Sequence, residues 1–222
     1  MLRFLSLERS KIKEKDLNMT SNIFYQMVNK ITKSKIIGAY LSDYSRKYYL
    51  REMGELLNKP HQTIKPYLES MVKEGVLIKV RRKNLVEYGL NHKDKRIYDL
   101  LIIAEKEKLM ERLNEDTLFR ILFEKLSPLF SKNIFIVFGS SVDKIKKESD
   151  IDILIIGNKS ASSEAEDFEK IFSKKLHIIQ VKDLNLISES LTKEIYKKHI
   201  ILNNTEKVIR FFGGLYEQNK LV

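Results

Sequence analysis

Residues 135–157 read FIVFGSSVDKIKKESDIDILIIG, and the organisation of the rest of the chain follows from them. Two apolar runs, 135–138 and 151–156, flank a Gly-Ser turn and a pair of aspartates. The second run is almost entirely β-branched or Leu, which is typical of a strand covered on both faces of a sheet. The pattern therefore predicts two neighbouring strands joined by a polar loop.

The two aspartates are the main functional signal. Asp152 interrupts the second apolar run, and an ionised carboxylate is costly there unless it is paired, solvated or bound to a metal. Asp150 lies two residues earlier, and residues i and i+2 of a strand point to the same face, about 6.5 Å apart. Two such carboxylates can share Mg²⁺, whose remaining ligands are commonly water and substrate phosphates. We therefore predict that Asp150 and Asp152 bind Mg²⁺ or Mn²⁺.

A phosphate-binding turn is expected just before them. Gly139 lacks side-chain bulk and lets a phosphate approach the backbone, while Ser140 and Ser141 offer hydroxyls. The pattern of Gly-Ser, nine residues and Asp-x-Asp resembles the signature of the polymerase-β-like nucleotidyltransferase superfamily, and the chain size suggests its small, minimal members. The resemblance covers residues 115–222.

This resemblance implies a catalytic role for the aspartates and an NTP as substrate. Gly139, Ser140 and Ser141 would cradle the phosphates, and Lys144, with Lys146 and Lys147, would attract them. Members of the superfamily often carry a third carboxylate on the next strand.

The strand expected at 176–181 contains no acid, and His177 stands at the matching position. His177 is therefore assigned to catalysis, as a metal ligand or a proton acceptor, and slow turnover is expected because an imidazole replaces the acid. Minimal antitoxin-like members also tend to carry Arg and Gly shortly after Gly-Ser, where this chain has Asp143 and Lys144.

Positive charge is concentrated in the first part of the chain. The formal net charge is +11. Residues 1–96 hold 21 Lys+Arg and 10 Asp+Glu, whereas residues 97–222 hold 20 of each. The whole excess is N-terminal, which indicates a polyanionic partner for this part, most often nucleic acid. A basic segment that only aids solubility is the alternative.

Three helices and a hairpin are expected between residues 35 and 92. The helices are predicted at 36–41, at 51–57 and from Pro60 to Gly75, and the strands at 76–80 and 85–90. This order resembles a winged helix-turn-helix. In that family the third helix enters the major groove of double-stranded DNA and the wing touches the backbone.

The resemblance places candidate DNA-binding residues on the third helix and on the hairpin. Those near the start of the helix are His61, Gln62, Thr63 and Lys65. Arg81, Arg82 and Lys83, expected in the loop between the strands, suit phosphates. Pro66 is expected to displace the reading face by a kink or to make the helix begin later. Because fold does not fix function, a role in protein interaction alone stays open.

We therefore expect an α/β fold of the α+β type in four segments. They are a partly helical N-terminal extension at 1–34, a winged helix-turn-helix at 35–92, a connecting helix at 93–114 and a small mixed-sheet nucleotidyltransferase-like domain at 115–222. Asn114 is the expected cap of the helix after the connection.

Composition bounds the location and the partners. The chain has no Cys, which excludes disulfides and thiolate metal sites. No apolar run is long enough to span a membrane and the first residues are too polar for a secretory signal, so we expect a cytoplasmic protein without a membrane partner. A helix at 24–31 is expected to pack on the next domain or to form a homodimer contact.

The favoured interpretation is a DNA-binding protein with a metal-dependent nucleotidyltransferase domain that transfers NMP from an NTP to an acceptor. A first alternative is a transcriptional regulator whose transferase-like domain is inactive and senses a nucleotide or a partner. A second is an antitoxin-like enzyme that modifies a companion toxin protein. The sequence does not reveal the acceptor, because pocket walls rather than the motif residues determine it.

Overall fold

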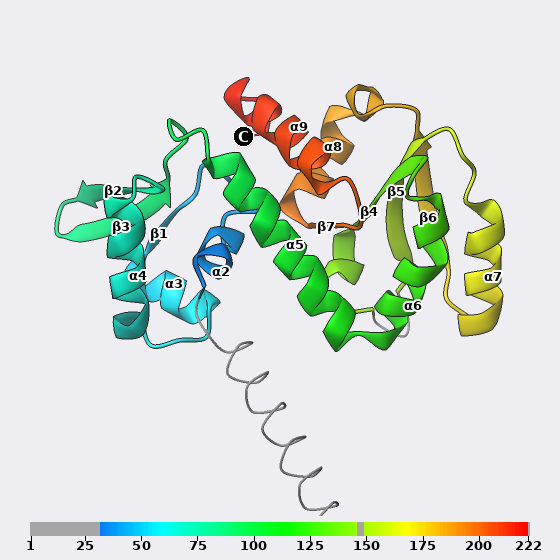
Figure 1. Cartoon of the computed structure of the whole chain (residues 1–222), viewed down its shortest axis with the longest axis horizontal. Coiled ribbons are helices and arrows are strands. Elements are labelled where there is room, and N and C mark those ends of the chain that lie inside the picture. The colour runs from blue at the N-terminus through cyan, green and yellow to red at the C-terminus, as the bar shows by residue number, and fades with distance from the viewer. Residues whose placement is uncertain (1–31, 146–148, 222) are drawn as a thin grey trace, which may run out of the picture. The chain divides into compact units, whose positions relative to one another are not determined.

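The computed structural model describes residues 32–145 and 149–221, which form a mixed α/β structure with two small sheets (Figure 1). This architecture agrees with the expected α+β class. The helix predicted at 24–31, together with Lys146 and Lys147, lies outside the described residues. Within the described ranges, no helix is long and apolar enough to cross a membrane.

The first sheet is antiparallel, with strand order β1-β3-β2. This part of the chain comprises α2 (Lys33–Gly38), β1 (Lys47–Tyr49), α3 (Leu50–Leu56), α4 (His61–Lys73), β2 (Leu77–Arg82) and β3 (Leu85–Leu90). Ile64, Leu68 and Met71 of α4 are spaced at i, i+4 and i+7 and are buried. Gly75, with a φ of 78°, follows the end of α4, as the sequence predicts.

Pro66 does not delay the start of α4. The helix runs from His61 to Lys73 with Pro66 inside it, so the expectation of a later start is wrong. A hydrogen bond of 2.9 Å from the Thr63 N–H to the Pro60 carbonyl supports the first turn. Pro66 is exposed and lacks the N–H that would bond the carbonyl one turn back. The helix thus tolerates it at its solvent-facing side.

The hairpin of β2 and β3 has a tighter turn than expected. Strand pairing continues to the pair Arg82 and Leu85, so only Lys83 and Asn84 form the turn. The placement of Arg81 and Arg82 in the loop is therefore wrong. They end β2, where successive side chains point to opposite faces of the sheet.

Two consecutive helices follow, α5 (Ile97–Glu115) and α6 (Thr117–Leu126). Asp116 accepts a hydrogen bond of 3.0 Å from the Phe119 N–H and so caps α6. The prediction of Asn114 as the cap is wrong, because α5 continues through that residue. α5 contacts both α2 and α9 and so links the early and late parts of the described chain.

The second sheet has strand order β6-β5-β4-β7. Its strands are β4 (Asn133–Phe138), β5 (Ile151–Gly157), β6 (Leu176–Val181) and β7 (His199–Ile201). β4 pairs antiparallel with β5 and β7, and β5 pairs parallel with β6. The remaining elements are η1 (Ser127–Leu129), η2 (Gly139–Val142), α7 (Ser162–Phe172), η3 (Leu184–Leu186), α8 (Glu189–Lys197) and α9 (Thr205–Glu217). The predicted strands around the Gly-Ser turn and the aspartates are present and adjacent.

The second sheet is covered by helices on both faces. Phe135, Val137 and Ile153 share one apolar cluster with Phe119 of α6 and Phe168 of α7. α8 and α9, orange to red in Figure 1, lie on the side of the sheet away from α7. Every residue of β4 is buried, so ligands can reach this sheet only at the ends of its strands.

Candidate functional site

Gly139, Asp152 and His177 meet at one end of the second sheet, which we call the aspartate edge. Asp152 is the second residue of β5, and its neighbours across the sheet are Phe138 of β4 and His177 of β6. Gly139 directly follows Phe138 and begins η2. The Gly-Ser turn and the Asp-x-Asp segment are thus brought together, as the sequence predicts.

Gly139 is fixed by two independent constraints. Its φ of 70° lies in the left-handed region that L side chains rarely adopt. A Cβ atom at this position would also lie 2.8 Å from Oδ2 of Asp152. The Asp152 carboxylate therefore packs directly on the Gly139 backbone, and a ligand that touches one residue is within reach of the other.

Asp152 is hydrogen-bonded to His177. Oδ1 of Asp152 lies 3.0 Å from Nδ1 of His177. The His177 side chain is 63% exposed and that of Asp152 28%. Because a carboxylate accepts hydrogen bonds, the contact favours the tautomer with the proton on Nδ1, which leaves Nε2 as an acceptor.

Asp150 and Ser141 have different roles in the local structure. Asp150 is exposed and lies just before β5, at the entrance to the strand. Ser141 is fully buried and donates its hydroxyl to the Asp150 carbonyl at 2.9 Å. Ser141 therefore holds Asp150 in place, and Ser140, which is exposed, is the hydroxyl of the turn that a ligand can reach.

Buried or paired cations hold the segments around the aspartates. Arg112 of α5 donates to the Ser141 carbonyl at 3.3 Å, and Lys174 donates to the Ser149 carbonyl at 2.6 Å. Lys198 forms an ion pair of 2.7 Å with Asp143. Lys144 is exposed. Sequence periodicity did not indicate the Arg112 and Lys174 contacts, because both residue types are usually exposed.

The donor set at the aspartate edge fits a hard divalent cation only in part. Among the described residues, no group of three or more His, Cys, Asp or Glu side chains could hold a metal ion. Mg²⁺ needs only one or two carboxylates when substrate phosphates supply further oxygens, and Asp150 and Asp152 meet that need. Oδ1 of Asp152, however, is already bonded to His177. A cation would therefore use Oδ2 or displace the imidazole.

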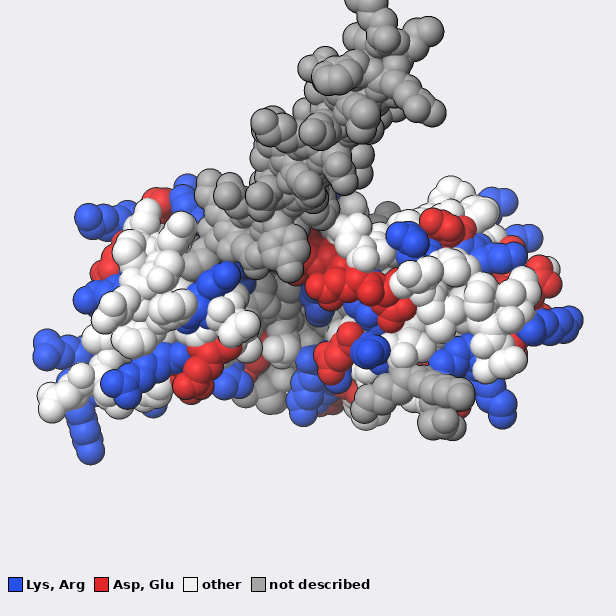
Figure 2. Space-filling view, turned by 90° about the horizontal axis from the view of Figure 1, so that it is seen from below, with Lys and Arg blue, Asp and Glu red and all other residues white. Residues whose placement is uncertain are grey.

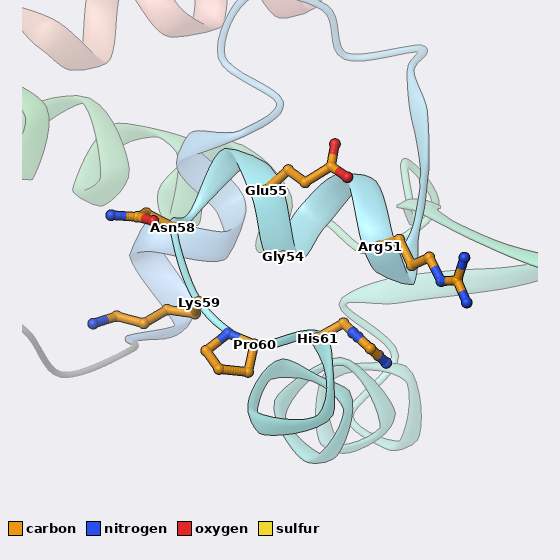
Figure 3. Close-up of a pocket in the computed structure, with 7 residues that line it drawn as sticks. All are labelled: Arg51, Gly54, Glu55, Asn58, Lys59, Pro60 and His61. Carbon is orange, nitrogen blue, oxygen red and sulfur yellow. The ribbon is translucent and has the colours of Figure 1, made fainter.

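A second candidate site lies on α3 and α4. His61, Gln62, Thr63 and Lys65 are all exposed, as a nucleic-acid interface requires. Figure 3 shows the turn between the two helices, with the side chains of Arg51 and His61 on one side of it and that of Lys59 on the other. A Cβ on Gly54 would lie 3.0 Å from the Lys59 carbonyl, so this glycine permits the close approach of the helices.

The cations of the hairpin differ in their partners. Lys79 is paired with Glu69 at 2.7 Å, and hydrogen bonds from Lys79 and Tyr88 lower the pKa of Glu69. Arg82 lies 3.2 Å from Glu87. Arg81 and Lys83 are exposed and take part in no salt bridge among the described residues. Lys and Arg side chains project from this part of the molecule, at the left in Figure 2.

A buried titratable pair lies behind the aspartate edge and was missed by the sequence pattern. His199 of β7 pairs with Phe138, and its Nε2 lies 3.7 Å from Oε2 of Glu105, a fully buried residue of α5. Burial raises the pKa of Glu105 to about 7, whereas burial and the nearby Lys108 lower the pKa of His199 to about 3. Both groups are therefore held in their neutral forms around pH 6.

Glu105 also has a structural role. Its Oε1 accepts a hydrogen bond of 2.9 Å from the Ile201 N–H. His199 Nδ1 lies 2.8 Å from the Ile195 carbonyl and therefore carries its proton there. The pair thus ties α5 and α8 to β7, the edge strand beside the Gly-Ser turn.

Comparison with known proteins provides no relative for this chain. No family model matches it, and no curated protein or solved structure matches it either. Any assignment of function therefore rests on the chemistry of the residues themselves.

Proposed function

We propose that this chain is a DNA-binding protein with a metal-dependent nucleotidyltransferase domain. Residues 35–92 form the winged helix-turn-helix of this proposal, and residues 115–222 the transferase domain. The observation that carries the proposal is the contact of the Asp152 carboxylate with the Gly139 backbone, beside His177. A phosphate-binding turn and a cation-binding carboxylate at one strand end are what NTP chemistry requires.

Each residue of the edge has a role in the proposed reaction. Gly139 gives the NTP phosphates access to the backbone, and Ser140 donates a hydroxyl to them. Asp150 and Asp152 hold Mg²⁺ or Mn²⁺, which supplies neutralisation of the phosphate charge when it is bound. An acceptor hydroxyl attacks the α-phosphate, and pyrophosphate leaves.

His177 is the proposed proton acceptor. Asp152 orients the ring through Nδ1, so Nε2 remains free to take the proton of the acceptor hydroxyl. The same contact withdraws one oxygen of Asp152 from the cation. We therefore expect slow transfer with Mg²⁺ and faster transfer with Mn²⁺, because Mn²⁺ accepts nitrogen ligands more readily.

The DNA-binding part of the proposal rests on exposure and charge. His61, Gln62, Thr63 and Lys65 present polar side chains along the first turns of α4. Of the hairpin cations, Arg81 and Lys83 lack the carboxylate contact that Arg82 has with Glu87. They are the proposed contacts to DNA phosphates, while Gln62 and Lys65 are the proposed contacts to base edges.

The proposed function is tested by pyrophosphate release. The full chain is incubated with each NTP, Mg²⁺ or Mn²⁺, and either duplex DNA or a cell extract as the source of acceptor. Release by the wild type above an Asp150→Asn blank supports transfer. His177→Asp should increase release with Mg²⁺, by up to about 10²-fold, because it restores an acidic ligand and base. A brisk Mg²⁺ reaction of the wild type that His177→Asp slows would contradict the proposed role of His177.

A second candidate is a transcriptional regulator that binds a nucleotide without turnover. The hydrogen bond between Asp152 and His177 favours it, because that bond occupies an oxygen that a catalytic cation would need. The two functions differ in a single comparison. Metal-dependent NTP binding with no pyrophosphate release above the blank, with any acceptor, selects the regulator.

A further inference from the structure

A second cavity lies at the opposite end of the same sheet. The strand pairs Asn133 with Gly157 and Ile156 with Val181 bring the start of β4 and the ends of β5 and β6 to one edge. A cavity of about 570 Å³ opens there. Since β4 runs from Asn133 to Phe138, this edge lies about 17 Å from the aspartate edge. We call the cavity the lysine pocket.

The lining of the lysine pocket is strongly positive. Four of its residues are lysines, namely Lys132, Lys159, Lys182 and Lys207. The residues that line it include no Asp or Glu. Within the described part of the chain, none of these lysines forms a salt bridge, whereas Lys170, Lys193 and Lys198 each do. Asp183 follows Lys182 in the chain, but it accepts hydrogen bonds from Asn185 and feels only the charge of Lys207.

The floor of the pocket is held rigidly by amide side chains. Asn133 is buried and forms two hydrogen bonds with the backbone of Lys159, as donor at 2.7 Å and as acceptor at 3.2 Å. Gln180 donates to the carbonyls of Gly157 and Lys159. A Cβ on Gly157 would lie 2.2 Å from Oδ1 of Asn133, so only glycine fits there. Lys159 therefore extends from a fixed backbone.

The start of α9 adds to the positive potential. Asn204 and Lys207, in the first turn of this 13-residue helix, line the pocket. Asn204 makes no side-chain hydrogen bond to cap the helix. The partial positive charge of a helix N-terminus therefore has the same sign as the four ammonium groups.

From this combination we infer that the lysine pocket binds closely spaced phosphate groups. Four ammonium groups from four separate segments, around an open hollow, suit several phosphates in a row better than one small anion. Such a row is supplied either by a free polyphosphate, such as the chain of an NTP, or by the backbone of a single-stranded nucleic acid. The inference does not depend on the proposed transferase reaction.

The test uses the full chain in EDTA, so that no divalent cation recruits phosphate to the aspartates. Inorganic triphosphate is titrated while the backbone amide signals of Gly157 and Asn158 are followed by NMR, and its affinity is measured by calorimetry. Lys159→Gln with Lys182→Gln should weaken the affinity roughly tenfold. Lys170→Gln with Lys193→Gln is the matched control, because it removes the same charge from lysines that pair with Glu166 and Glu189. The control should change the affinity less than about twofold.

An oligonucleotide arm distinguishes the two sources of phosphate. For single-stranded DNA, the pocket variant should lower the slope of log affinity against log salt by about 0.7 for each phosphate that the lysines no longer neutralise. A weaker affinity for both ligands identifies a nucleic-acid strand, and a weaker affinity for triphosphate alone identifies a free polyphosphate. Equal effects of the pocket variant and its control on both ligands, or unshifted Gly157 and Asn158 signals, would overturn the inference. Asp152→Asn should leave the EDTA result unchanged even if the proposed function fails.

Discussion

The two edges of the second sheet handle charge in opposite ways. At the aspartate edge, Asp152 bonds His177, Lys198 pairs with Asp143, and Arg112 and Lys174 donate to backbone carbonyls. At the other edge, four lysines line a cavity without a described ion pair, over a floor held by amides. Charges with partners fix the shape of a loop, whereas charges without partners remain available to a ligand. The comparison predicts which substitutions affect structure and which affect binding alone.

Gly139→Ala should have the largest effect. The new Cβ meets Asp152 at a left-handed φ, so we expect a decrease of more than about 2 kcal/mol in the free energy of unfolding and the loss of nucleotide binding. Urea denaturation and calorimetry measure the two effects. Gly214→Ala in α9 is the control, because its Cβ would meet no atom within 4 Å, and it should stabilise the helix by up to about 1 kcal/mol. A fully stable Gly139→Ala variant that binds nucleotide would show that the contact is unimportant.

Glu105→Gln tests the buried pair behind the aspartate edge. Burial raises the pKa of Glu105 to about 7 from 4.5, so between these pH values the folded chain holds a proton that the unfolded chain has released. Its contribution to stability is therefore present below pH 4.5 and is lost as the pH rises through about 7. Gln keeps the acceptor for the Ile201 N–H and cannot ionise. We expect the variant to be more stable than the wild type at pH 8, on the order of 3 kcal/mol.

His199 opposes this dependence at lower pH. Its folded pKa of about 3 lies below the ordinary 6.5, so the unfolded chain binds the extra proton and stability rises with pH across this range. The two slopes cancel in the wild type between about pH 4.5 and 6.5. In Glu105→Gln only the rise remains. Urea denaturation at a series of pH values measures both curves, and parallel curves for the two proteins would contradict this account.

Arg81→Gln with Lys83→Gln should have a smaller effect, on binding alone. Neither residue has a described salt bridge, so the double variant should keep its stability while its salt slope for duplex DNA falls by about two units, about 0.9 for each phosphate contact. Lys79→Gln is the control, because Lys79 is already paired with Glu69 at 2.7 Å. Fluorescence anisotropy across a range of salt concentrations measures the slopes. An equal decrease in the control would show that DNA responds only to net charge.

The sequence predicted the arrangement of the aspartate edge because its signal is local. Apolar strands around residues 135–138 and 151–156 have an unambiguous period, and their adjacency follows from a short connection. The alignment that set His177 opposite Asp152 matches the observed strand register. The limits of elements were less predictable, since Asn114 and Asp116 are both good caps and only the helix ends distinguish them.

The lysine pocket and the buried pair could not be predicted in the same way. Lys132, Lys159, Lys182 and Lys207 are far apart in the sequence, within a segment whose charges balance overall. Only the meeting of three strand ends and a helix start brings them together. Glu105 lies among charged residues on a helix, a pattern that predicts exposure, and the packing of α5 on β7 alone reveals its burial.

The central claim is that the aspartate edge binds a nucleotide through a divalent cation. The most direct measurement is calorimetric titration of the full chain with an NTP, with Mg²⁺ or Mn²⁺ and then with EDTA, on the wild type and on Asp152→Asn. Asp167→Asn, on α7 and away from the edge, serves as the control for the removed charge. We predict metal-dependent binding to the wild type and to Asp167→Asn, and its loss in Asp152→Asn with stability retained. Unchanged metal-dependent affinity in Asp152→Asn would place the nucleotide elsewhere and contradict the account.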